Sequence, residues 1–300
     1  MKNVRLNSRR AHYPDVDKFS KLVGISADKL VKAFRIEKMW RKKILDTKSA
    51  RKRKTLYVDV YNKVHKIYGS SLINRRLKGN PKDGIVKLFK KELNGKAVLD
   101  VGCGEGWFLK SISKNLKHKE LVGIDASSAH INPSTEDIQY IKSDIVKFKF
   151  KHRFDVVFSD QVLEHIAPAD LEIHLRSIRE ILKPGGLFIV ILPNRLFGPS
   201  DVTRIIDFSY LGRTPACGTH LNESTYGEML LLLRKNGFGR MTAPIPVPRL
   251  RNVLSNVRIN PEILAKIEKS SLLNLLRIFR FHNRPILRLE INLVCQKSGR

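Results

Sequence analysis

The sequence has few cysteines and no long apolar run. Cys103, Cys217 and Cys295 form an odd, scattered set, which predicts neither a disulfide framework nor a zinc site. No apolar stretch approaches the roughly 18 residues that a transmembrane helix needs. Residues 1–5 lead into no apolar signal core, so we expect a soluble, unsecreted, cytoplasmic protein.

Acidic residues are scarce relative to basic ones, and the imbalance is localised. Lys and Arg number 57 against 28 Asp and Glu, a net charge of +29. Residues 1–80 carry +17, residues 81–240 only +4 and residues 241–300 carry +8. Basic flanks on a nearly neutral core suggest an anionic partner: RNA, an anionic membrane surface, or a phosphorylated or sugar-nucleotide substrate. No RNA-binding module signature is visible, which disfavours RNA.

An apolar strand followed by three alternate glycines is the most informative motif. Residues 97–101 are apolar apart from Asp100, and Gly102, Gly104 and Gly106 follow in a G-x-G-x-G pattern before an expected helix. Glycines here allow a tight turn and close approach of a ligand to the backbone. Trp107 stands where a dinucleotide fingerprint has its third glycine, which disfavours NAD and favours S-adenosylmethionine.

Acidic residues end the next expected strands. Asp125 follows Leu121–Ile124 at a separation that suits a ribose ligand, and Asp144 follows Ile138–Lys142, where its carboxylate can accept a hydrogen bond from an adenine amino group. Further strands are expected at 154–158 and 186–191. Each feature alone also fits an ordinary tight turn or helix cap. Their ordered combination favours a cofactor site.

The segments VLDVGCGEG, VGIDAS, SDI, FDVVFSDQVLEHI and LKPGGLFIVILPN together resemble the class I S-adenosylmethionine-dependent methyltransferases, particularly the group that includes ubiquinone-biosynthesis-type enzymes. The resemblance covers about residues 85–240. It implies an α/β, Rossmann-like, doubly wound sheet of seven strands in the order 3-2-1-4-5-7-6, with the last strand antiparallel.

The resemblance also implies the cofactor residues. The methionine-side loop would contain Asp100, Gly102, Cys103, Gly104 and Gly106. The nucleoside side would contain Asp125, Ala126, Ser143, Asp144 and Ile145, and Asp160 and Gln161 would border the methyl-transfer region.

Two histidines are candidate catalytic bases, because imidazole titrates near neutral pH. His165 follows the fourth strand and His220 lies in a long loop. Together with Glu164 they resemble part of an E-x-x-E-H plus His pattern of some magnesium-assisted O-methyltransferases, including small-RNA 2′-O-methyltransferases. Gln161 replaces the first acid, and hard cations prefer charged oxygen ligands, so we expect no metal. His165 can instead cap or pack its helix.

The expected organisation is a basic N-terminal extension over residues 1–80, mostly helical from 26 to 78, that forms a cap on a methyltransferase domain over 81–300. Within the domain we expect a substrate lid at 194–224, a helical insertion at 246–284 and a last strand near 287–294. The primary hypothesis is an enzyme that methylates O or N of a small acceptor, anionic or linked to a lipid or sugar. An RNA methyltransferase and a non-catalytic cofactor-binding partner subunit are the alternatives. Nothing in the sequence indicates an oligomeric state.

Overall fold

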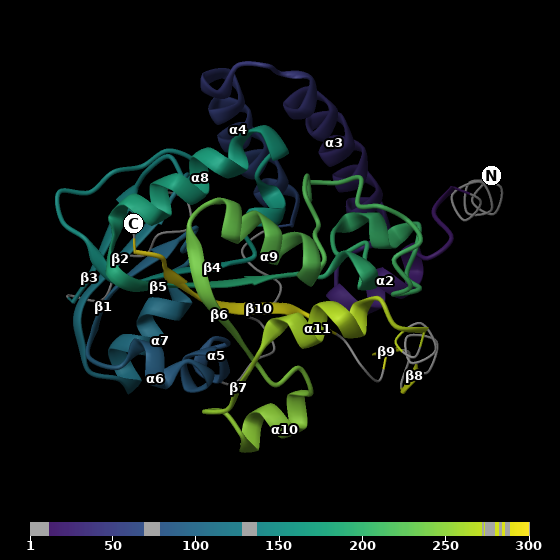
Figure 1. The fold of residues 1–300 in the computed structure, drawn as a ribbon. Coiled ribbons are helices and arrows are strands. Elements are labelled where there is room, and N and C mark those ends of the chain that lie inside the picture. Colours follow the sequence, from purple (N-terminus) through teal and green to yellow (C-terminus); the bar gives the residue numbers. More distant parts are fainter. Residues whose placement is uncertain are drawn as a thin grey trace.

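The chain is built around one mixed β-sheet with helices on both faces (Figure 1). The computed structural model describes residues 12–68, 79–127, 137–271, 273, 280–281, 284–285 and 289–299. The helices there are α2 (Val16–Val23), α3 (Ala27–Asp46), α4 (Ala50–Tyr68), α5 (Asp83–Leu88), α6 (Lys90–Leu93), α7 (Trp107–Asn115), α8 (Pro168–Ile181), α9 (Tyr226–Lys235), α10 (Pro248–Val253) and α11 (Pro261–Glu268), with 3-10 turns η2 (Leu163–His165), η3 (Arg195–Phe197) and η4 (Val202–Ile205). The strands are β1 (Lys96–Val101), β2 (His118–Asp125), β3 (Ile138–Lys142), β4 (Phe154–Asp160), β5 (Leu182–Leu192), β6 (Phe238–Pro244), β7 (Arg258–Ile259), β8 (Arg280–Phe281), β9 (Arg284–Pro285) and β10 (Ile291–Lys297).

The main sheet has the order β3-β2-β1-β4-β5-β10-β6-β7. Strands β1 to β5 pair in parallel, whereas β10 runs antiparallel to both β5 and β6. The predicted Rossmann-like order and antiparallel last strand are therefore confirmed. The prediction of seven strands is wrong, because β7 pairs with β6 at Ala243 and Pro244 and makes an eighth. A two-residue strand leaves no periodic pattern in a sequence.

Both faces of the sheet are buried, and neighbouring residues of β1 show how. Val98 lies in a cluster with Phe108 of α7, while Leu99 lies in a second cluster with Leu175 of α8. Successive side chains of a strand point to opposite faces, so a strand covered on both sides is apolar along its length. Figure 1 shows α7 on one side of the sheet and α8 and α9 on the other.

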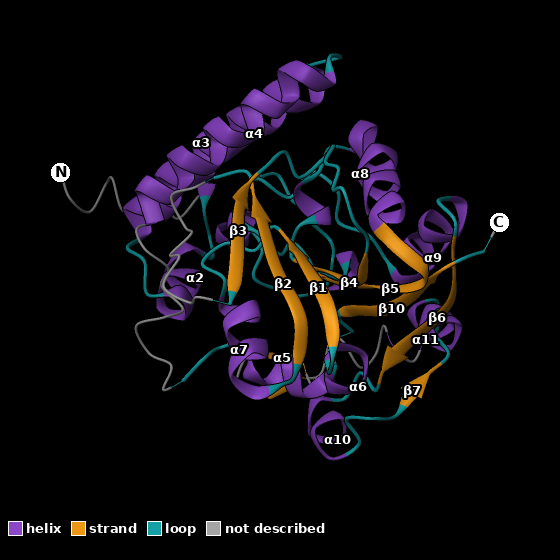
Figure 2. Cartoon of the chain, turned by 90° about the vertical axis from the view of Figure 1, so that its left-hand side faces the viewer, coloured by secondary structure: helices purple, strands orange, loops and turns teal. Residues whose placement is uncertain are grey.

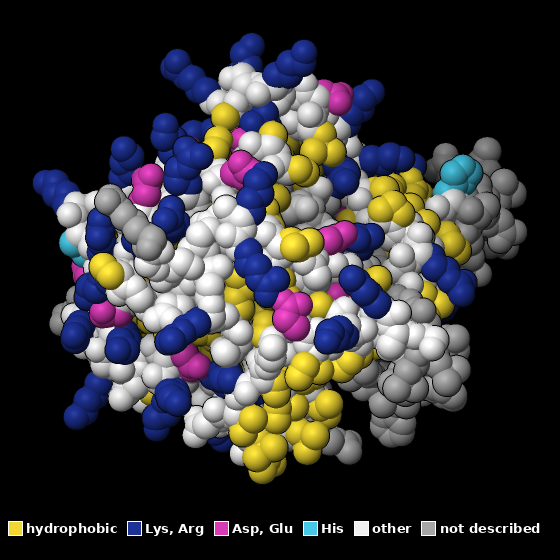
Figure 3. Space-filling model, in the orientation of Figure 1, with side chains coloured by type: hydrophobic (Ala, Val, Ile, Leu, Met, Phe, Trp, Pro, Cys, Tyr) yellow, Lys and Arg dark blue, Asp and Glu magenta, His cyan; other side chains and the backbone are white. Residues whose placement is uncertain are grey.

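An antiparallel pair of helices, α3 and α4, lies across the carboxyl ends of β1 to β3 (Figure 2). Helical structure was expected from residue 26 to 78, and residues 69–78 lie outside the described part of the chain. Arg53 of α4 anchors this pair through a buried ion pair with Asp170 of α8, at 2.7 and 2.5 Å, and the Tyr57 hydroxyl donates to the same carboxylate at 2.9 Å. Lys and Arg side chains project from the outer surface of the pair (Figure 3).

The segment expected as a substrate lid, residues 194–224, is an irregular loop with the two turns η3 and η4. A backbone bridge joins its ends, at Asn194 and Ser224. A capping box follows, in which the Thr225 hydroxyl accepts the Glu228 N–H at 3.2 Å and the Glu228 carboxylate accepts the Thr225 N–H at 2.9 Å. The loop is therefore fixed at both ends.

The insertion at 246–284 is only partly helical, and the helical prediction is wrong for β7 and for the short β8–β9 pair. Its apolar residues 272, 275, 276 and 278 lie outside the described residues. The last strand begins at Ile291 rather than near residue 287, and residues 286–288 are likewise not described. Among the described helices, none is long and apolar enough to cross a membrane.

Candidate functional site

Three glycines turn the chain between β1 and α7. Gly102, Gly104 and Gly106 have φ angles of 77°, 50° and 73°, in the left-handed region that glycine adopts without strain. A Cβ atom on Gly102 would lie 2.5 Å from Val162, and one on Gly106 would overlap the Tyr140 ring. No atom of the described residues lies within 4 Å of a Cβ atom built on Gly104. The loop therefore packs tightly at its ends and leaves open space at its middle.

Asp125, at the end of β2, holds this loop. Its Oδ2 atom accepts the Gly104 N–H at 3.0 Å and its Oδ1 atom accepts the Ser127 N–H at 2.9 Å. Each carboxylate oxygen keeps a second lone pair for a further donor. Cys103 is buried beneath the loop, with its N–H on the Ile124 carbonyl at 3.0 Å. Ala126 follows Asp125 and is half-buried.

The residues after β3 lie beside α4. Asp144 accepts the Val146 N–H at 2.8 Å and forms an ion pair with Lys54 of α4 at 3.3 Å. The Ser143 N–H donates to the Asp125 carbonyl at 2.9 Å, which joins the ends of β2 and β3. Ile145 follows, and its carbonyl accepts a hydrogen bond from a buried histidine of α8.

Asp100 is the penultimate residue of β1 and Asp160 the last residue of β4, and both are largely buried. Burial raises the pKa of both carboxyl groups, and the positive charge of Lys82 opposes that shift. Lys82 pairs with Asp160 at 2.5 Å. Gln161 follows with a φ of 59°, a conformation that a non-glycine residue adopts rarely. All the residues expected around a cofactor thus lie at the carboxyl ends of four adjacent strands.

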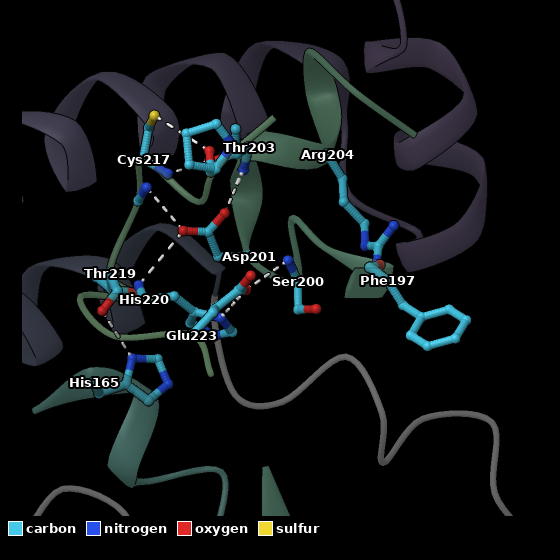
Figure 4. Close-up of polar contacts among 12 residues, drawn as sticks. His165, Phe197, Ser200, Asp201, Thr203, Arg204, Cys217, Thr219, His220 and Glu223 are labelled. Carbon is cyan, nitrogen blue, oxygen red and sulfur yellow. Dashed lines mark hydrogen bonds and ion pairs between the residues drawn. The ribbon is translucent and has the colours of Figure 1, made fainter. Parts of the chain in front are cut away.

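A second cluster lies just beyond β4. Turn η2 brings Glu164 and His165 against His220, and one donor atom from each of the three lies within 4.8 Å of the others. The two imidazole rings are 4.6 Å apart between centroids, edge to face. Figure 4 shows His165 beside the segment that carries Thr219 and His220. The structure therefore brings together both predicted catalytic histidines.

Hydrogen bonds show which ring nitrogen of each histidine carries hydrogen. His165 Nδ1 lies 3.1 Å from the Thr219 carbonyl, and His220 Nδ1 lies 2.7 Å from the Glu223 carboxylate. Carbonyl and carboxylate oxygens accept hydrogen bonds, so both Nδ1 atoms carry hydrogen. In its neutral form each ring then presents an unprotonated Nε2.

Burial and neighbouring charges give the two imidazoles very different pKa values. Burial and the charge of His220 lower the pKa of His165 to about 3. Burial alone would lower the pKa of His220, but its hydrogen bond to Glu223 and the charges of Glu164 and Asp201 raise it to about 9. At neutral pH His220 therefore carries the proton and His165 accepts none. Neither histidine then suits the role of a simple general base.

Glu164 is fully buried, and neither of its carboxylate oxygens has a hydrogen-bond partner among the described residues. Burial raises its pKa to about 7. An unpaired buried carboxylate is costly, and such a group in a native fold calls for a ligand or ion. Together, this carboxylate and two imidazole nitrogens with hydrogen-bonded Nδ1 atoms have the chemistry of a divalent-cation site.

Helices α3 and α4, expected as a basic helical cap, contribute residues to this region that no sequence pattern singled out. Trp40 and Tyr61 line a small cavity beside His165, and the Tyr61 and His165 rings are 5.6 Å apart between centroids. Asn62 accepts the Ser127 hydroxyl at 3.2 Å. Helix α3 carries a regular apolar stripe, but a stripe shows only that a helix packs, not what it packs against.

Residues 73–239, more than half of the chain, match the family described as "Methyltransferase domain". A ubiquinone biosynthesis O-methyltransferase of Bradyrhizobium diazoefficiens is 30% identical over 135 residues, which cover 43% of this chain and 51% of that protein. The mitochondrial one of Dictyostelium discoideum is 31% identical over 146 residues, covering 43% and 44%. The chain thus spans about half the length of these curated relatives.

Solved methyltransferases have low identity to this chain. The 1,6-didemethyltoxoflavin-N1-methyltransferase of Burkholderia thailandensis is 15% identical, with a TM-score of 0.48 over 82% of this chain and 87% of that one. Family membership rests on the match over residues 73–239 and on the strand order of the sheet. The chain belongs to the class I S-adenosylmethionine-dependent methyltransferases.

Proposed function

We propose that the whole chain transfers a methyl group from S-adenosylmethionine to a hydroxyl oxygen of a small acceptor. The observation that carries this proposal is the cluster in which Glu164 and His165, just after β4, meet His220 from the loop after β5, beside the expected cofactor edge. Methyl transfer from a sulfonium is an in-line displacement, and positioning donor and acceptor supplies much of the acceleration. A site for this reaction needs a bound cofactor and a means of binding and deprotonating the acceptor.

For the cofactor, we propose that the glycine loop faces the methionine part and that Asp125 binds the ribose. Support comes from the open space beside Gly104 and from the free lone pairs of the Asp125 carboxylate. Asp144 would bind the adenine amino group, and Lys54, which now pairs with it, would shift. Asp160 and Gln161 would border the methyl group.

For the acceptor, Glu164, His165 and His220 would hold a divalent cation. Such an ion lowers the pKa of a bound hydroxyl, which makes the oxygen a better nucleophile. From the sequence we predicted no bound metal, because Gln161 stands where the related pattern has its first acid. That prediction is untested, and the grouping of these three side chains supports the opposite proposal. One carboxylate and two imidazoles suit a borderline cation such as Zn²⁺, Mn²⁺ or Co²⁺ better than Mg²⁺. With the ion bound, both histidines would be ligands rather than bases.

The cavity beside His165 has a volume of about 10 Å³, about enough for one water molecule. Its walls are largely aromatic and aliphatic, from Trp40, Ile44, Tyr57 and Tyr61. The cavity is therefore too small to hold an acceptor in the arrangement described here. The apolar walls favour an apolar acceptor, such as one linked to a lipid, and the similarity to ubiquinone biosynthesis O-methyltransferases favours oxygen over nitrogen as the methylated atom.

Purified protein tests this proposal. It would be incubated with methyl-labelled S-adenosylmethionine and three acceptors: a phenolic compound with a prenyl tail, an aromatic amine, and a short RNA. We expect label in the phenolic compound. Label in the amine would revise the methylated atom, and label in RNA would favour the basic flanks as an RNA surface. Cofactor binding with no transfer to any acceptor would favour a non-catalytic subunit.

A further inference from the structure

Two side chains of α3 hold the peptide segment that carries His220. Glu37 is 2% exposed, and its Oε2 atom accepts the Thr219 N–H at 3.0 Å and the Thr219 hydroxyl at 3.2 Å. One helical turn later, the Arg41 guanidinium donates to the His220 carbonyl. The Thr219–His220 segment is thus held at both ends by one face of α3.

Both histidines depend on this segment. The Thr219 carbonyl accepts the Nδ1–H of His165, and the His220 ring follows directly in the chain. A shift of Thr219 would therefore move His220 and release the hydrogen bond that fixes the tautomer of His165. Displacements of about 1 Å in positioning groups can cost about a hundredfold in rate.

The neighbourhood leaves Glu37 little freedom. The Tyr68 hydroxyl donates to its Oε1 atom at 2.7 Å. A Cβ atom on Gly218 would lie 2.6 Å from Glu37 Oε2 and 2.6 Å from Asp201 Oδ2. Asp201 accepts the N–H groups of Gly218 at 2.8 Å and His220 at 3.4 Å from the other side. The segment therefore fits between two buried carboxylates, one from α3 and one from its own loop.

Helix α3 lies outside residues 73–239, the part of the chain that matches the family. We propose that α3 is nevertheless part of the active site, and that Glu37 and Arg41 are positioning residues for His165 and His220. This inference rests on the proposed function, because it takes the two histidines to act where the methyl group is transferred.

The test compares the full chain with Glu37→Ala, Glu37→Gln and Arg41→Met, and with Asp46→Ala as a control at an exposed position of the same helix. The readouts are the imidazole ¹⁵N resonances of His165 and His220, the cofactor dissociation constant, and kcat and KM for methyl transfer. Glu37→Gln keeps an oxygen for Thr219 and is the conservative variant. Arg41 is half-buried, so Arg41→Met tests the proposal even if Glu37→Ala fails to fold.

We expect Glu37→Ala and Arg41→Met to shift the imidazole resonances of both histidines and to lower kcat at least about tenfold. Cofactor affinity should stay unchanged, and Glu37→Gln and Asp46→Ala should resemble the parent. Unchanged imidazole resonances in folded Arg41→Met would overturn the proposal. Because the resonances need no turnover, this outcome is distinct from a failure of the proposed methyl transfer.

Discussion

The imidazole rings of His165 and His220 lie edge to face with their centroids 4.6 Å apart, although one follows β4 and the other lies in the loop after β5. Each Nδ1 atom is hydrogen-bonded away from the pair, to Thr219 or to Glu223. Once His220 has given up its proton, both Nε2 atoms are electron-pair donors beside the carboxylate of Glu164, which has no hydrogen-bond partner among the described residues. This arrangement leads to the first prediction.

Purified protein freed of metal should bind one Co²⁺ ion, detected by the visible absorption of the bound ion. Zn²⁺ should displace it and Mg²⁺ should not, because two imidazole ligands favour borderline metals. His165→Ala and Glu164→Gln should each weaken binding at least about tenfold, and His152→Ala, at an exposed histidine, should not. Equal Co²⁺ affinity in all four proteins would exclude this cluster as the metal site.

The glycine loop gives a prediction with a matched control. Gly106→Ala should destabilise the fold and weaken cofactor binding, because the added methyl group overlaps Tyr140 and the residue has a φ of 73°. Gly227→Ala adds the same methyl group in α9, where only the Thr225 hydroxyl lies within 4 Å. Thermal unfolding and calorimetric titration of the cofactor would be compared. A Gly106→Ala protein as stable as Gly227→Ala would contradict the close packing described here.

Asp125→Ala should weaken binding of S-adenosylmethionine at least about tenfold, equivalent to about 1.4 kcal/mol. The substitution removes the proposed ribose acceptor and also the acceptor for the Gly104 and Ser127 N–H groups. Calorimetry would measure the affinity, and Asp137→Ala, at an exposed carboxylate, is the control. Unchanged affinity in Asp125→Ala would remove the ribose assignment.

His174 should contribute to acid destabilisation. It is fully buried, its Nδ1 donates to the Ile145 carbonyl at 2.6 Å, and burial lowers its pKa to about 4. An unfolded histidine takes up its proton near pH 6.5, so between about pH 6.5 and 4 the unfolded state binds one more proton. The free energy of unfolding should therefore fall by about 1.4 kcal/mol per pH unit as pH is lowered.

Urea unfolding of the parent and of His174→Gln at several pH values measures this contribution. In the variant, the free energy of unfolding should depend on pH less steeply over that range, by about 1.4 kcal/mol per pH unit, whatever its absolute stability. Parallel curves for the two proteins would mean that His174 binds a proton equally well in both states.

Local patterns predicted well where the strands of the sheet end. The apolar run before Gly102 and the acid at or near the end of each strand are local signals, and parallel strands place their carboxyl ends together. The eighth strand was not predictable, since β7 has two residues and pairs only because α10 and its turn return the chain to β6. The edge-to-face packing of the His165 and His220 rings was likewise not predictable from the sequence.

The contacts of α3 could not be predicted from the sequence for a different reason. Glu37 looked like one acid among many basic residues of an amphipathic helix, and no spacing rule relates it to Thr219, far along the chain. Hydrogen bonds of this kind follow from tertiary packing alone. Glu223 lies only three residues after His220, so the sequence allows the two side chains to meet. Only the geometry of the loop, however, determines that Glu223 is the partner of His220.

The most direct test of the central claim is transfer of a tritiated methyl group from S-adenosylmethionine into a whole-cell extract that is then separated into RNA, lipid and small-molecule fractions. Gly104→Asp is the inactive control, because it places a carboxylate in the open space where we expect the cofactor. The account predicts label in the lipid or small-molecule fraction with the parent protein and none with Gly104→Asp. Label confined to RNA, or equal label with both proteins, would contradict it.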